Sequence, residues 1–282
     1  MADVRQLPFL LQLLDDRSEV VQEALMEELA GFGPDLETEL GRLAEPPSHS
    51  QRHAIQELLT RYSRKWLRHA WSAWYSVPGD KARLEHALSL IAEFQNGPGY
   101  GQHLRRVLDQ LAVEFSQRTD LAQDELGLAH FLFIEKGLKG ERTDYYHPNN
   151  SNLLFVIEAR RGLPISLACV YILLGHRLGL DIQGCNWPGH FFARVHVGQT
   201  LMLVDCFNEG HCIDVDSFLK MQGPSREAAQ AVLATDATAE VIVARVLGNL
   251  ARAYQRVERW AEAEMFTGLM RDLERHHPPR RG

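Results

Sequence analysis

The stretch NWPGHFFARVHVGQTLMLVD, residues 186–205, predicts a β-hairpin and decides the fold of this chain. Apolar side chains alternate along both halves of the stretch with the period of two that is typical of strands. Gly198 and Gln199 interrupt the alternation, and glycine in the first position of a two-residue turn suits a type II′ hairpin. This turn sets Val197 opposite Thr200 and thereby fixes the register of every other pair.

The register divides the hairpin into two faces of different chemistry. One face carries His190, Arg194, His196 and Asp205, and His190 and Asp205 are diagonal neighbours on it. Diagonal residues lie about 7–8 Å apart at the backbone, which puts the two side chains within reach of a hydrogen bond. A carboxylate that orients an imidazole is the base half of a nucleophilic triad, although such a pair also satisfies polar groups at the end of a sheet. The opposite face is apolar and carries Phe191, Ala193, Val195, Val197, Met202, Val204 and Cys206.

Helical patterns surround the hairpin, so the sequence predicts an α+β fold with three regions. Residues 1–119 show apolar residues at three- and four-residue spacing, and their first helix pair resembles a HEAT repeat. Residues 120–225 form the core, in which a helix over 164–178 has proline at its first position and Gly179 at its end. Residues 226–282 indicate a tetratricopeptide-like helix pair and a short tail. Strands are predicted over 182–187, 190–197 and 200–207.

Composition and charge exclude several classes of protein. The chain has 30 basic and 37 acidic residues and a formal net charge of -7, so it lacks the basic footprint of proteins that bind nucleic acid or anionic membranes. No apolar stretch approaches the roughly 20 residues that span a bilayer, and no export signal is visible. The 4 cysteines therefore indicate free thiols in a reducing compartment, and we expect a cytoplasmic protein.

Four short motifs stand in order within residues 120–225: PNNS at 148–151, RRGLPISL at 160–167, NWPGHF at 186–191 and LVDCFN at 203–208. Together they resemble the SirB-type transglutaminase-like family. The resemblance implies a helix packed on a small antiparallel sheet, with His190 and Asp205 at the histidine and aspartate positions of a cysteine-dependent triad. The family core is similar to one found in some eukaryotic F-box proteins, which implies recruitment of a partner instead of catalysis.

The chain departs from this family pattern at the position of the nucleophile. In active relatives a cysteine stands two residues after a glycine at the start of a helix, where free amides and the helix dipole lower its pKa. Counting from Gly162 gives Pro164, which has neither a thiol nor an amide hydrogen. Ser166 in the first helical turn is a candidate replacement, but a serine there also contacts the free amides of the helix start.

No cysteine of the core replaces the missing thiol in this interpretation. Cys169 lies three residues after Ser166 within an apolar run, which is typical of an inert core thiol. Cys206 points to the sheet face opposite His190, and the direction of Cys185 is not fixed by the hairpin. The sequence therefore predicts an incomplete triad.

We expect a protein- or peptide-binding module, or a regulatory module, that lacks the usual catalytic cysteine. The alternative is a cytosolic amide or ester hydrolase that uses Ser166, His190 and Asp205, because the polar face of the hairpin is retained. No cofactor is expected. No metal site is expected either, because His211 and Cys212 point in opposite directions on a strand and the chain has no CxxC pair.

Overall fold

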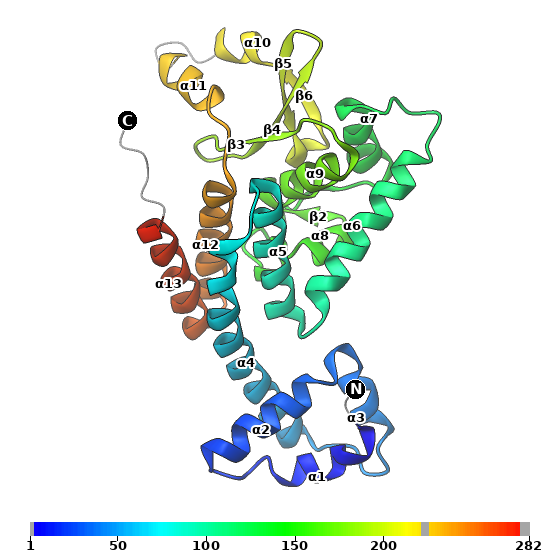
Figure 1. The fold of residues 1–282 in the computed structure, drawn as a ribbon, viewed down its shortest axis with the longest axis vertical. Coiled ribbons are helices and arrows are strands. Elements are labelled where there is room, and N and C mark those ends of the chain that lie inside the picture. The colour runs from blue at the N-terminus through cyan, green and yellow to red at the C-terminus, as the bar shows by residue number, and fades with distance from the viewer. Residues whose placement is uncertain (1–2, 221–225, 277–282) are drawn as a thin grey trace.

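A computed structural model of the chain describes residues 3–220 and 226–276 and has the predicted α+β architecture (Figure 1). A buried helix, α9 (Pro164–Leu178), packs on a four-stranded antiparallel sheet. Helices from both halves of the chain contact α9 as well. The helix is thereby enclosed on all sides, which explains why its apolar run has no amphipathic pattern.

The N-terminal helices form a separate apolar cluster at one end of the molecule (Figure 1). Helix α4 begins at a capping box, in which the Ser48 hydroxyl accepts from the Gln51 amide at 3.2 Å and the Gln51 side chain accepts from the Ser48 amide at 2.9 Å. The first half of α4 completes this cluster, and its second half, from Leu67 onward, belongs to the main core. The HEAT-like character of this region stays a prediction. The elements are η1 (Val4–Gln6), α1 (Leu7–Gln12), α2 (Glu19–Ala30), η2 (Gly33–Asp35), α3 (Leu36–Arg42) and α4 (His49–Trp71).

Two helix pairs pack beside each other around α9. The first pair consists of α5 (Asp80–Asn96) and α6 (Tyr100–Ser116), joined by the glycine-proline turn at 97–99. The second pair consists of α12 (Ala239–Arg256) and α13 (Trp260–His276), which dock on α5 and α4. This docking is expected, because a single helix pair cannot bury its own apolar face. The tetratricopeptide likeness stays a prediction, and the predicted tail lies outside the described residues.

The main hydrophobic core joins the sheet, α9 and both helix pairs. It extends from Leu67 to Leu273, and every α9 residue from Pro164 to Gly175 is buried within it. Gly179 caps α9 with a positive φ of 72°, as predicted. Hydrophobic packing therefore groups α5, α6, α12 and α13 with the sheet, while the boundaries at 119/120 and 225/226 remain predictions from sequence pattern.

The hairpin has the register that the sequence predicts. Val197 pairs with Thr200 and Arg194 pairs with Leu203 in the antiparallel ladder. Gly198 has a positive φ of 61°, which suits glycine at the first position of the turn. The sheet order is β3-β4-β5-β6, with β3 (Gln183–Cys185), β4 (Phe192–Val197), β5 (Thr200–Asp205) and β6 (His211–Asp214).

The three predicted strands are shorter than expected, and β6 of this sheet lies outside the predicted strand ranges. The Pro188-Gly189 pair turns the chain before β4, and the His190 amide donates to the Trp187 carbonyl at 3.1 Å within that turn. Residues 186–191 are therefore a loop that delivers His190 to the end of the sheet. Strand β6 is too short to show an alternation of its own and depends on pairing with β5.

The sheet face that carries His190 is covered, beyond the site, by α10 (Val215–Lys220) and α11 (Arg226–Leu233), which enclose a small apolar cluster. Arg194 lies on the same sheet face as His190, as the register predicts. Its side chain is buried there, and its guanidinium bonds to the Leu233 carbonyl and the Asp236 carboxylate. This face is therefore not open to solvent at Arg194, because partners about forty residues away in sequence take up its charge.

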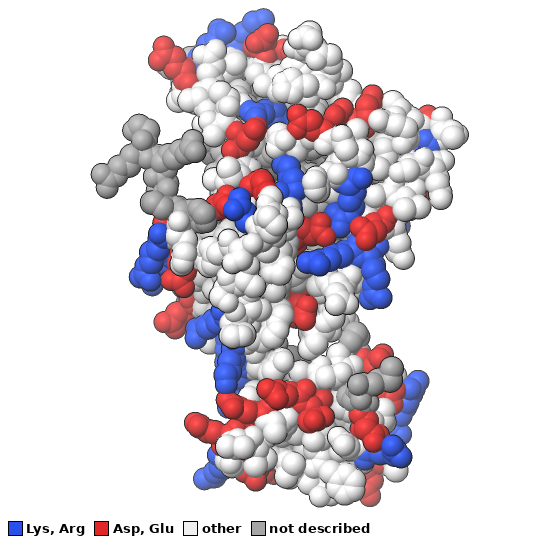
Figure 2. Space-filling view, in the orientation of Figure 1, with Lys and Arg blue, Asp and Glu red and all other residues white. Residues whose placement is uncertain are grey.

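The surface carries mixed charge. On the face drawn in Figure 2, acidic side chains gather over the N-terminal helices and basic ones over α6. Within the described ranges, no helix has the length and apolar character required to cross a membrane.

Short elements connect the layers of the fold. The connecting elements are η3 (Ser72–Ser76), α7 (Glu125–Ala129), the π-helical turn η4 (His130–Glu135), β1 (Lys139–Gly140), η5 (Pro148–Ser151), α8 (Leu153–Ala159), β2 (Arg161–Gly162) and η6 (Cys206–Asn208).

Candidate functional site

The candidate site is the imidazole–carboxylate pair at the end of the hairpin. His190 leaves the Pro188-Gly189 turn just before β4, and Asp205 is the last residue of β5. The His190 Nε2 and the Asp205 Oδ1 lie 2.9 Å apart, so the hydrogen bond expected from the register is present. The structure therefore brings together two of the three residues proposed for a triad.

The Asp205 carboxylate also holds the turn that follows it. Its Oδ1 accepts from the backbone amides of Phe207 and Asn208, each at 3.2 Å, and its Oδ2 accepts from the Asn208 side-chain amide at 2.7 Å. Burial alone would raise the pKa of Asp205, but the hydrogen bonds from His190 and Asn208 outweigh burial and hold that pKa below its ordinary value. The carboxylate is therefore ionised at neutral pH and fixed in direction.

The orientation of His190 leaves one ring nitrogen available. Because Nε2 is held by Asp205, Nδ1 is the nitrogen that remains to exchange a proton, and it has no hydrogen-bond partner among the described residues. The ring packs edge-on against Phe192 at 4.5 Å and Phe207 at 6.1 Å between centroids. The side chain is still 23% exposed, so the imidazole is fixed in place but accessible.

The start of α9 is brought to this site by a short parallel pairing. Strand β1 pairs with β2, and β2 leads directly into Pro164 at the first position of α9. Gly140 in β1 lies against the Phe207 ring so closely that a Cβ there would sit 2.5 Å from ring carbons. The turn after Asp205 and the helix start are thus held together, as the family resemblance implies.

Ser166 lies in the first turn of α9, but no hydrogen bond connects it to the imidazole. Its hydroxyl is buried and has no hydrogen-bond partner in the part of the chain that the structure describes. The alternative role, a side-chain contact with the free amides of the helix start, is not seen either. The proposed role of Ser166 as a nucleophile stays a prediction.

The thiols of this region are buried or half-buried and protonated. All four cysteines are free. Burial raises the pKa of Cys169 to about 12 and that of Cys185 to about 11. Burial also raises the pKa of Cys206 and, less strongly, that of Cys212. None of these thiols has the lowered pKa of an activated nucleophile.

Two residues of the site were given no role in the sequence analysis. Asn208 links the Asp205 carboxylate to Arg142, whose Nη2 donates to the Asn208 Oδ1 at 2.5 Å. Asn208 stands in the LVDCFN motif three residues after Asp205, a spacing at which a short polar side chain turns back on the chain. Arg142 carries no such local signal, because its partner is 66 residues away.

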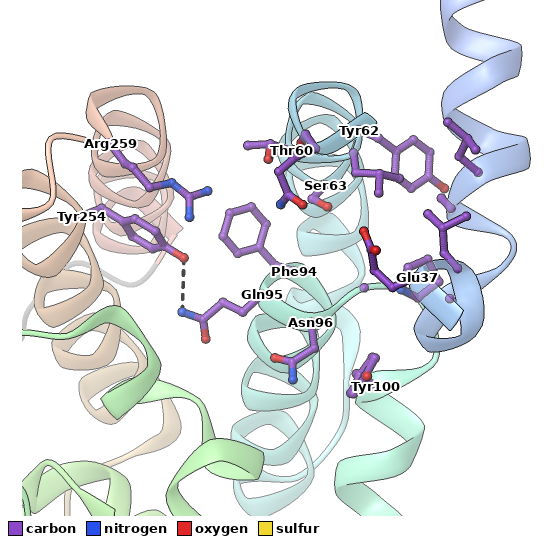
Figure 3. Close-up of a pocket in the computed structure, with 18 residues that line it drawn as sticks. Glu37, Thr60, Tyr62, Ser63, Phe94, Gln95, Asn96, Tyr100, Tyr254 and Arg259 are labelled. Carbon is purple, nitrogen blue, oxygen red and sulfur yellow. Dashed lines mark hydrogen bonds between the residues drawn. The ribbon is translucent and has the colours of Figure 1, made fainter. Parts of the chain in front are cut away.

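A second hollow lies between the N-terminal helices and the main core (Figure 3). It is a cavity of about 270 Å³ whose lining includes Tyr62, Ser63 and Arg259. Gln95 at its edge donates to the Tyr254 hydroxyl and to the Pro148 carbonyl, each at 3.2 Å, and so ties the cavity wall to the loop before α8. The cavity lining includes neither member of the imidazole–carboxylate pair.

Across residues 3–220 and 226–276, no group of three or more His, Cys, Asp and Glu side chains is arranged to hold a metal ion.

A buried helix on an antiparallel sheet, with an imidazole–carboxylate pair where two strands end, defines the transglutaminase-like class of proteins. The sequence profile of the transglutaminase-like superfamily matches residues 102–248, more than half of the chain, so the chain belongs to this superfamily as predicted.

The relatives include bacterial proteins and part of a eukaryotic one. The chain is 31% identical to a UPF0162 protein of Xylella fastidiosa over 204 residues, which cover 68% of this chain and 72% of the relative. It is 29% identical over 175 residues to a UPF0162 protein of Pseudomonas aeruginosa, covering 57% and 61% of the two chains. It is 27% identical over 129 residues to F-box only protein 21 of Homo sapiens, covering 43% of this chain and 20% of that protein. No solved structure matches the chain at a significant level.

Proposed function

We propose that this protein is a cytoplasmic protein- or peptide-binding module built on a transglutaminase-like core that has lost its nucleophile. One observation carries the proposal: His190 and Asp205 are paired at 2.9 Å, while no thiol or hydroxyl of a described residue bonds to the imidazole. The base and its orienting group are in place without a group to activate. Pro164 stands where the family pattern requires the cysteine.

The chemistry of the remaining candidates supports a binding role. A catalytic thiol works as the thiolate, whereas the pKa of Cys169 is about 12 because the thiol is buried. A serine hydroxyl is a poor nucleophile unless a base takes its proton, and Ser166 has no such bond. The match to F-box only protein 21, which covers 20% of that protein, supports use of such a core as one part of a larger binding protein.

A hydrolase remains the second candidate because of one observation. The Ser166 hydroxyl is buried without a partner, and the Nδ1 of His190 is also unpaired among the described residues. Catalytic hydrogen bonds in unliganded sites are often long and form only with substrate. Under this alternative, Ser166 would attack an amide or ester carbonyl while His190 takes the hydroxyl proton and Asp205 holds the imidazole.

Selective labelling separates the two candidates. Wild-type protein is treated at pH 7.5 with a fluorophosphonate serine probe and, separately, with iodoacetamide, and labelled sites are found by peptide mass spectrometry. We expect labelling that is absent or equal in wild type and in His190→Ala, because no nucleophile depends on the imidazole. His196→Ala is the matched control, since His196 is an exposed histidine on the same strand.

The opposite result would favour the hydrolase. Labelling of Ser166, Cys169 or Cys185 that is present in wild type and in His196→Ala but disappears in His190→Ala would show a working base. Such a result would overturn the binding-module proposal.

A further inference from the structure

Three arginines and two tyrosines from residues 142–146 and helix α12 lie near the His190–Asp205 pair. We call this group the arginine–tyrosine rim. The two tyrosines are 37% and 43% exposed, and their rings meet edge to face at 5.2 Å. The Arg256 guanidinium carbon lies 3.9 Å from the centre of the Tyr146 ring. The members of the rim are Arg142, Tyr145, Tyr146, Arg245 and Arg256.

The rim adjoins the candidate site through one aromatic ring. Phe207 lies 6.1 Å from the His190 ring and 6.2 Å from the Tyr145 ring, measured between centroids. The Arg142 guanidinium covers the same ring at 5.0 Å. The Phe207 ring therefore links the rim to the partly exposed His190 imidazole.

Arg245 is the most enclosed arginine of the rim, and its contacts with described residues are all neutral; they include the Phe191 ring, whose centre lies 5.7 Å from the guanidinium carbon. It is only partly exposed, and it forms hydrogen bonds with the Trp187 carbonyl at 3.0 Å and with the Asn186 side chain. Burial lowers the pKa of Arg245, and no described carboxylate forms an ion pair with it. A partly buried cation is normally compensated by an opposite charge, as Arg177 is by Glu85.

The other two arginines of the rim also lack acidic partners. Arg142 bonds to a side-chain amide and Arg256 covers a ring, and neither forms an ion pair with a described carboxylate. Two exposed acids, Asp144 and Glu209, lie near the Arg142 end. The positive charge without a carboxylate partner among the described residues is therefore carried by α12, on Arg245 and, about three helical turns later, on Arg256, in a chain whose net charge is -7.

We propose that the arginine–tyrosine rim binds an extended acidic segment of a partner protein, with carboxylates paired to Arg245 and Arg256 and apolar groups covering the two tyrosines. This proposal rests on the proposed function, because it names the partner chemistry of the same site. Arginine and tyrosine are among the residues that most often dominate the binding energy of protein interfaces. Guanidinium–carboxylate hydrogen bonds are stronger than neutral ones and are direction-specific.

Fluorescence anisotropy with designed peptides tests the proposal. The probe is a fluorescein-labelled ten-residue peptide that alternates Asp or Glu with Tyr and Leu, and its controls carry Asn and Gln, or Lys, in place of the acids. We expect the acidic peptide alone to bind, and to bind more weakly in 500 mM NaCl than in 50 mM NaCl. Arg245→Gln and Arg256→Gln should each weaken binding by about tenfold or more, because each removes one charged partner.

A matched arginine outside the rim controls for general charge. Arg271→Gln removes an exposed arginine from α13 and should leave the affinity unchanged. Arg245 also holds the loop at Asn186, so circular dichroism and thermal melting check that Arg245→Gln is folded. If that variant unfolds, Arg256→Gln decides the outcome, because it alters an exposed side chain.

Each alternative outcome overturns the proposal. Absence of binding by the acidic peptide, equal binding of the amide peptide, or equal weakening by Arg271→Gln would show that the rim is not an acidic-segment site. A different observation would refute the proposed function. If mass spectrometry of the peptide after incubation revealed cleavage that requires His190, the binding-module proposal would fall. The rim would then stand as a substrate-binding surface.

Discussion

Replacing Asp205 with alanine tests whether the pair at the end of the hairpin is a structural element of the fold. The carboxylate accepts from His190 at 2.9 Å, from the Asn208 side chain at 2.7 Å and from two backbone amides at 3.2 Å. A neutral hydrogen bond contributes about 0.5–1.5 kcal/mol to stability and one to a charged group about 1.5–3 kcal/mol. The two amide contacts are long, and in the variant the His190 imidazole can bond to water in place of the carboxylate, because its side chain is 23% exposed. Both features reduce the loss of stability. We therefore expect Asp205→Ala to lower the free energy of unfolding by about 3 kcal/mol at pH 7.

The loss should depend on pH in a direction fixed by the pKa of Asp205. Folding lowers this pKa, because the hydrogen bonds from His190 and Asn208 outweigh the opposing effect of burial. The ionised carboxylate is then favoured in the folded state, so its stabilisation is fully present above the unfolded pKa of about 3.9. It is lost as the pH falls through the lower folded value. The difference in the free energy of unfolding between wild type and Asp205→Ala should be constant from pH 7 to about pH 5 and narrow below about pH 4.

Urea unfolding followed by tryptophan fluorescence and circular dichroism measures this difference. Asp15→Ala is the control, because Asp15 is exposed and substitutions of that kind usually change stability by less than about 0.5 kcal/mol. The slope of the free energy against urea should be similar in all three proteins. Two results would refute the structural role of the carboxylate. One is a loss of unfolding free energy as small as that of Asp15→Ala, and the other is a difference from wild type that does not narrow at acid pH.

Two further predictions concern packing beside the site. Gly140→Ala should destabilise the protein by about 1–3 kcal/mol, because the new Cβ would lie 2.5 Å from the Phe207 ring. The control is Gly41→Ala, which changes a helical glycine with open space around its Cβ position and should be neutral or stabilising in the same thermal melts. Equal changes in stability for the two variants would contradict the close approach of Gly140 to Phe207. Cys169, whose pKa burial raises to about 12, should react with Ellman's reagent at pH 7.5 more than about 100-fold more slowly in the native protein than in urea. Fast reaction of native Cys169 would show that the thiol is neither buried nor protonated.

The parts of the site that were predicted correctly depend on neighbours in sequence. The Gly198 turn and the alternation around it set the pairing of Val197 with Thr200, and that register placed His190 beside Asp205. Each of these steps uses local backbone geometry, for which a single sequence carries strong signals.

The parts that were missed depend on distant neighbours. Arg142 reaches Asn208 across 66 residues, and the buried Arg194 bonds to a carbonyl 39 residues away. Nothing in the spacing of the hairpin residues indicates which arginine meets which acceptor, because those contacts are set by tertiary packing. The same reason explains why the partly buried Arg245, which has no carboxylate partner among the described residues, became evident only in three dimensions.

The Asp205 carboxylate has a structural role in addition to its bond with His190. Asp205 accepts the two amides of the turn that follows β5, and that turn places Phe207 between His190 and Arg142. Loss of the carboxylate would therefore disturb the aromatic ring on which one end of the arginine–tyrosine rim is built. The pair therefore also shapes the surface beside it.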